Sequence, residues 1–180
     1  MTGSWVAQTV GRDERDEPMR PIGEREALEK WLDYHRDTLL WKCSGLTGEQ
    51  LARRAVPPSS LSLLGLVRHM AGVERWWFRI HVGGQDLEHI FFTEDNLEGD
   101  FNDLDPNQAE QNIEAYRREI DLARQAAAGK HLDEAVFSRG DHPDRQFNVR
   151  TIYLHMIEEY ARHNGHADLI RERIDGVIGD

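Results

Sequence analysis

Apolar residues recur at spacings of three and four along four long stretches of the chain, a periodicity typical of amphipathic helices. In the first stretch, Leu28, Leu32 and Leu39 follow this spacing. The pattern predicts a shorter helix in the segment "TGEQLARRA". The long helices are expected at about residues 24–44, 60–82, 106–128 and 149–175.

Residues that cap or break helices mark the ends of these segments. Thr47, Ser60 and Asn148 stand where an N-cap side chain is needed, and Pro106 stands at a first helical position. Gly176 follows the last apolar position of the fourth long helix, where a glycine favours termination.

The arrangement of these elements predicts the fold class. No strand pattern of any length competes with the helices, and a loop of about residues 85–105 separates the second from the third. We therefore expect an all-α protein, an antiparallel four-helix bundle with a long crossover loop between helices 2 and 3.

The N-terminal part of the chain carries many charges and is interrupted by Pro18 and Pro21. Such a composition disfavours a packed core, so residues 1–22 are expected to form a flexible segment. The helical domain then spans residues 23–180.

Composition limits the kinds of partner and compartment. The 180-residue chain has a formal net charge of −11, which would repel the phosphates of nucleic acid. No run of residues is long and apolar enough to span a membrane. Cys43 is the only cysteine, so no internal disulfide can form, and a cytoplasmic location is expected. Cys43 itself is expected to be a core residue.

Polar side chains fall on the apolar face of the fourth helix. At about 100° per residue, with His155 as origin, Glu159 lies at about 40°, His163 at about 80° and His166 at about 20°. Ile152 and Ile170 occupy the same stripe, each at about 60°. An imidazole and a carboxylate would therefore face the core, where a charge is costly unless it is paired or bound to a metal.

The second helix has a comparable exception, because His69 lies in the middle of an apolar face. A Glu-x-x-x-His pair on one helix that faces a histidine on another could hold a divalent cation. The alternatives are a hydrogen-bonded core histidine and an ordinary i,i+4 charge pair. Spacing also leaves open a set in which His155 or His166 replaces one of these ligands. The apolar neighbours of His69 are Leu66, Val73, Trp76 and Ile80.

The segments "LLGLVRHMAGVERWW" and "HMIEEYARHNGHADLIRE" resemble the DinB-like family of metal-binding four-helix bundles, over about residues 24–175. They look most similar to its mini-circle protein branch. In this family one ligand is a histidine of the second helix, and two more precede a His-x-Gly step in the fourth. The resemblance implies that His69, Glu159 and His163 are the ligands. Most members have histidine at the position of Glu159, whereas a branch similar to mycothiol-dependent maleylpyruvate isomerases has glutamate.

The resemblance also implies a function. Two imidazoles and one carboxylate leave a coordination position open, as in catalytic sites, with zinc favoured and nickel, iron or manganese possible. Similar proteins are thiol-dependent transferases or isomerases, which implies mycothiol as cosubstrate and a small electrophile as substrate. The alternative is a non-catalytic metal-binding protein with a stress-response or structural role.

Further residues are expected near this site. His155, His166 and Trp76 are candidates for its lining, and His142 with Arg145 for its mouth. A homodimer formed through helix faces is also predicted.

Overall fold

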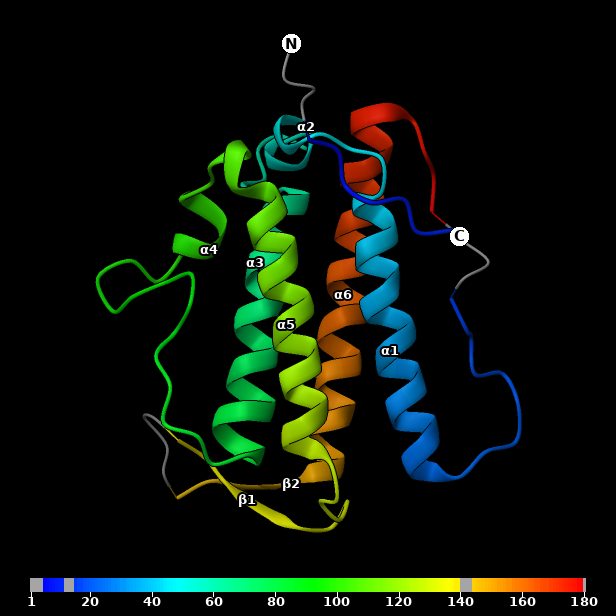
Figure 1. Cartoon of the computed structure of the whole chain (residues 1–180), viewed down its shortest axis with the longest axis vertical. Coiled ribbons are helices and arrows are strands. Elements are labelled where there is room, and N and C mark those ends of the chain that lie inside the picture. The colour runs from blue at the N-terminus through cyan, green and yellow to red at the C-terminus, as the bar shows by residue number, and fades with distance from the viewer. Residues whose placement is uncertain (1–4, 12–14, 140–143, 180) are drawn as a thin grey trace.

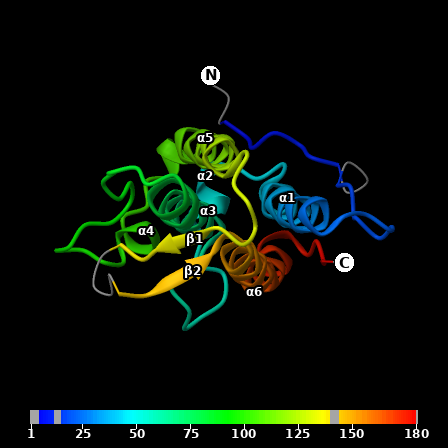
Figure 2. The same cartoon turned by 90° about the horizontal axis from the view of Figure 1, so that it is seen from below.

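The computed structural model describes residues 5–11, 15–139 and 144–179. Figures 1 and 2 show the long helical rods side by side, with α1 packed mainly on α6 and α3 mainly on α5. The rods are α1 (Glu24–Cys43), α3 (Leu63–Glu74) continued by η2 (Arg75–Val82), α5 (Ala109–Ala127) and α6 (Val149–Asp175). The short elements are α2 (Gly48–Ala52), α4 (Gly99–Asn102), η3 (Pro106–Gln108), β1 (Ala135–Phe137) and β2 (Gln146–Asn148). The prediction of a mostly helical protein is confirmed.

Most of the predicted helix ends are also confirmed. Thr47 forms a capping box with Gln50 at the start of α2, and Asn148 caps α6 through a bond from Thr151 N to Asn148 Oδ1 of 2.8 Å. Gly176 adopts a left-handed conformation with φ of 80° and ends α6. These ends depend on local sequence, which is why capping residues predict them.

The predicted start of the second helix at Ser60 is wrong. A turn closed by a bond from Ser59 N to Val56 O keeps the chain non-helical after the two prolines. The N-cap is Ser62, whose Oγ accepts a hydrogen bond of 3.1 Å from Gly65 N. The helix therefore begins two residues later than its apolar pattern indicates.

Two local features were not predicted. β1 and β2 form an antiparallel hairpin of three residues per strand, too short to give a visible alternation of apolar and polar residues. The end of the second rod, η2, is a π-helix rather than an α-helix. π-Helical turns are frequent at functional sites, and this one follows His69 by six residues.

The described part of the N-terminal segment contacts the helical domain. Ala7 exchanges backbone hydrogen bonds with Gly45 and Leu46, and the guanidinium of Arg15 stacks 4.3 Å from the Trp41 ring centroid. That residues 1–22 form a separate flexible segment remains a prediction. Among the helices that the structure describes, none is long and apolar enough to cross a membrane.

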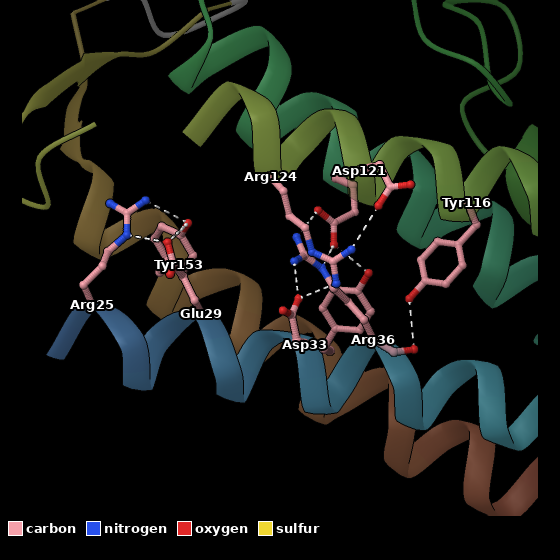
Figure 3. A network of polar contacts seen from close by, with 10 residues as sticks. Arg25, Glu29, Asp33, Arg36, Tyr116, Asp121, Arg124 and Tyr153 are labelled. Carbon is pink, nitrogen blue, oxygen red and sulfur yellow. Dashed lines mark hydrogen bonds and ion pairs between the residues drawn. The ribbon is translucent and has the colours of Figure 1, made fainter. Parts of the chain in front are cut away.

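A buried ionic network connects the four rods. Arg36 of α1 donates two hydrogen bonds of 2.7 Å to the carboxylate of Glu74 on α3, and Tyr160 of α6 donates a third of 2.7 Å. Tyr116 of α5 donates to the backbone oxygen of Arg36 at 3.4 Å, as Figure 3 shows. Glu74 is fully buried and Arg36 is 3% exposed. Neither charge has access to bulk water, so each depends on the other.

We expect Glu74→Gln to lower the free energy of unfolding by about 3 kcal/mol, because it leaves the buried guanidinium of Arg36 without its main counter-charge. Urea denaturation measures this change. Arg124→Ala is the control, since its ion pair with Asp33 is solvent-exposed and should contribute less than about 1 kcal/mol. Equal effects of the two substitutions would contradict the conclusion that the buried charges of Arg36 and Glu74 depend on each other.

Candidate metal centre

Three potential ligands meet between α3 and α6. Glu159 and His163 are four residues apart on α6, so their side chains leave the same face of the helix one turn apart. His69 faces them from α3, which packs against α6. One ligand atom from each residue lies within 4.8 Å of the other two, so the structure brings the predicted trio together.

The distances between these atoms suit a small cation. Glu159 Oε1 lies 3.5 Å from His69 Nε2 and 3.4 Å from His163 Nε2. Ligands at 2.0–2.2 Å from a tetrahedral zinc ion lie about 3.4 Å from one another. Nitrogen and oxygen donors of this kind are accepted by zinc and by several other transition metals. The residues present therefore fit a divalent cation.

The protonation states also favour metal binding. Burial, with a smaller contribution from the nearby His69, lowers the pKa of His163 to about 4, so this imidazole is neutral at pH 7. Burial alone would raise the pKa of Glu159, but the nearby His163 and His69 outweigh it and lower this pKa. A neutral imidazole and an ionised carboxylate are the forms that coordinate metals.

Asp100, on α4 in the crossover loop, orients His69. Its Oδ2 lies 2.8 Å from His69 Nδ1, and the side chain is almost buried. A proton held on Nδ1 by this carboxylate leaves the lone pair of Nε2 free to face Glu159. Carboxylate–histidine pairs of this type commonly fix the tautomer of metal ligands.

Arg68 holds the loop in this position. Its guanidinium donates to the backbone oxygens of Asp100 at 3.1 Å and Gly99 at 2.9 Å, and it stacks 4.3 Å from the Phe91 ring centroid. Arg68 and His69, which are adjacent on α3, therefore act on the same site. Arg68 fixes the loop, and the loop carries Asp100, the hydrogen-bond partner of His69.

The structure separates the two alternative histidines. His166 Nδ1 lies 3.4 Å from His163 Nδ1, so His166 stands behind the trio, where it can orient His163. His155 is directed elsewhere: its ring packs 4.7 Å from the Trp77 ring centroid. Among the described residues, only the set of His69, Glu159 and His163 forms a metal-ligand cluster.

A pocket of about 430 Å³ opens beside His69. Trp76 lies in its lining, and Asp100 and Phe101 contribute from the loop. Most of the surface that lines this pocket is formed by carbon atoms. The complete lining is His69, Gly72, Val73, Trp76, His89, Phe92, Leu97, Glu98, Asp100 and Phe101.

Together the helical fold and the clustered His-Glu-His side chains define a class of helical proteins with a candidate site for a divalent cation. A family model described as Mycothiol-S-transferase matches residues 27–176, so the chain belongs to this family. The match confirms the resemblance to a DinB-like, mycothiol-related family. A search of curated proteins found no match.

Other candidate residues have structural roles or lie elsewhere. Cys43 is 1% exposed, and burial raises its pKa to about 12, as expected for a core residue. Of the two residues expected at the site mouth, His142 lies outside the described residues and Arg145 is exposed next to the hairpin.

Sequence reasoning missed the role of Asp100 and the aromatic loop residues around it. They lie about thirty residues beyond His69 in a segment without helical periodicity. No spacing rule connects such a loop to the helix it covers, so the sequence carried no signal for the pairing.

We expect His69→Ala, Glu159→Ala and His163→Ala each to abolish stoichiometric binding of a divalent cation, because each removes one of three protein ligands. Metal analysis of the purified variants measures the content. His155→Ala is the matched control, since its ring faces Trp77, and it should keep its metal. Loss of metal from the control alone would contradict the assignment of ligands.

We expect Asp100→Asn to weaken cation affinity about 10- to 100-fold without abolishing it, because the amide no longer fixes the His69 tautomer as a carboxylate does. Competition with a chromogenic chelator measures the affinity. Asp103→Asn, a few residues along the same loop and away from His69, is the control. An unchanged affinity in Asp100→Asn would show that this hydrogen bond does not support the centre.

Proposed function

We propose that this protein is a metal-dependent S-transferase that joins a low-molecular-weight thiol of the mycothiol type to a small electrophile. One observation carries the proposal. The three ligand atoms of His69, Glu159 and His163 converge within 4.8 Å of one another, and the imidazole of His69 also lines an apolar pocket. The family match supports the thiol and the transfer reaction.

The metal we propose is zinc, with nickel, iron or manganese as alternatives that the same donors accept. Three protein ligands leave a coordination position for an exchangeable group, as in catalytic rather than structural zinc sites. When bound, such an ion supplies Lewis acidity that favours the deprotonated form of a thiol at neutral pH.

The residues of the chain have separate tasks in this proposal. Asp100 keeps the proton of His69 on Nδ1, and His166 faces Nδ1 of His163 in the same way. The aromatic side chains of the pocket exclude water from the electrophile and place it next to His69. In the reaction the thiol sulfur forms a bond to carbon, the leaving group departs with its electron pair, and the thiol proton passes to solvent.

The proposal also covers the arrangement of the helices, the partners of the protein and its location. We assign the four rods to an antiparallel four-helix bundle, with the segment between η2 and η3 as the long crossover. We also propose a small-molecule substrate, no nucleic-acid or membrane partner and a cytoplasmic location. The homodimer remains a prediction from sequence.

A non-catalytic metal protein, with a structural or stress-response role, is the competing possibility. The buried Arg36–Glu74 network and the apolar core connect the rods without any contribution from the candidate metal ligands. The fold should therefore persist without metal. A structural metal, in contrast, would be required for folding.

We expect the purified protein to conjugate mycothiol to a model electrophile, to lose this activity after chelation and to regain it when zinc is restored. Thermal unfolding of the metal-free protein should remain cooperative. Product formation is measured by mass spectrometry. Glu159→Ala is the inactive control. Absence of conjugation by a metal-loaded, folded protein, or unfolding upon chelation, would favour the non-catalytic role.

A further inference from the structure

The pocket beside His69 is lined by two groups of stacked rings. Phe101 stacks on His69, with ring centroids 4.9 Å apart and an angle of 28° between the planes. His89 stacks on Phe92 at 3.9 Å and lies 5.4 Å from Trp76. Flat aromatic molecules pack favourably against surfaces of this kind.

Apolar side chains continue from these rings to the mouth of the pocket. Val73 lies in the lining, and Leu97 at the mouth is 71% exposed, a large fraction for a leucine. A ligand that covers Leu97 would remove apolar surface from water. Gly72 has no side chain to fill the floor, and a Cβ there would come within 3.9 Å of Phe92. The pocket is therefore open and apolar at the same time.

The charges of the pocket disfavour an anionic guest. Among the described lining residues none is a lysine or arginine, whereas Glu98 and Asp100 are carboxylates. With Glu159 at the centre, these carboxylates carry three negative charges against the two positive charges of a divalent cation, and Arg162, which lies 3.8 Å from Glu159, is offset by its ion pair with Glu158. Arg68 is nearly buried and is bound to loop carbonyls. Burial also lowers the pKa of His89, which keeps this imidazole neutral at pH 7.

From this lining we infer that the electrophile is a neutral, flat, aromatic molecule and that carboxylated electrophiles are poor substrates. The inference rests on the proposed function, since it names the substrate class of the same site. Glu98 is the residue that most directly sets this charge preference, because it is exposed at the pocket and is not a partner of a metal ligand.

Two matched electrophiles test the inference, 4-nitrobenzyl chloride and 4-(chloromethyl)benzoate, each with mycothiol and corrected for the spontaneous reaction. In both, the thiol sulfur bonds to the benzylic carbon, chloride leaves with the electron pair, and the thiol proton passes to solvent. We expect kcat/KM to be at least about tenfold higher for the neutral compound, because like charges at a partly desolvated site repel. Comparable values would overturn the inference while leaving the transferase proposal intact.

Two charge reversals on the loop sharpen the test. Glu98→Lys should reduce the preference for the neutral compound at least about threefold, since it replaces repulsion by attraction at the pocket. Glu94→Lys makes the same change on the same loop outside the pocket, and it should leave the preference unchanged. Equal effects of the two variants would mean that the preference does not arise in this pocket.

A binding measurement separates this inference from the proposed function. Calorimetry with the unreactive pair 4-nitrotoluene and 4-methylbenzoate requires no thiol and no turnover. We expect the neutral compound to bind at least about tenfold more tightly. If neither electrophile is consumed but this difference is found, the transferase proposal fails and the assignment of the pocket stands. Equal or absent binding of the pair would overturn the assignment.

Discussion

The buried ion pair between Arg36 and Glu74 is the constraint on which the rest of the structure depends. A buried charge without its partner is strongly destabilising, so α1 and α3 can pack only where these two side chains meet. Tyr160 extends the constraint to α6 through its bond to Glu74. Glu74 is five residues from His69, and Tyr160 is adjacent to Glu159. A shift of α6 by one turn would therefore break the network and separate the candidate ligands together.

The crossover loop imposes a second constraint on the same centre. It carries Asp100 to His69 and is held by Arg68, whose guanidinium satisfies two loop carbonyls. A Cβ at Gly99 would lie 2.7 Å from the backbone oxygen of Phe91, so the chain turns there in a space that only glycine fits. The length of this loop is thus explained by its task, since it must reach across α3 and return to α5 while covering one side of the site.

The sequence predicted the parts of the molecule that depend on periodicity. Helix α6 begins and ends where its caps indicate, and the i,i+4 spacing of Glu159 and His163 is sufficient to place both side chains on one face of it. The apolar neighbours of His69 placed it on the core face of its helix, and the family resemblance implied that it faces the other two residues. The parts that depend on tertiary contacts were missed: the pairing of Asp100 with His69, the hairpin of β1 and β2, and the π-helical winding of η2. The prediction of Ser60 as the N-cap was wrong for a related reason. A turn that includes the two prolines moves the N-cap of α3 to Ser62.

The helices and the loop therefore determine different properties of the candidate site. The rods, fixed by Arg36 and Glu74, determine whether His69, Glu159 and His163 meet at all, and changes there would affect the fold as well as the centre. Most of the pocket's aromatic and acidic lining comes from the loop, at Phe92, Glu98 and Phe101. Phe101 also packs against the core, whereas the exposed Glu98 can change without disturbing it. Under the proposed function, loop substitutions change which electrophile fits the pocket while the candidate metal ligands stay the same. On this physical basis, the identity of the loop side chains is a better guide to the substrate than the ligands are.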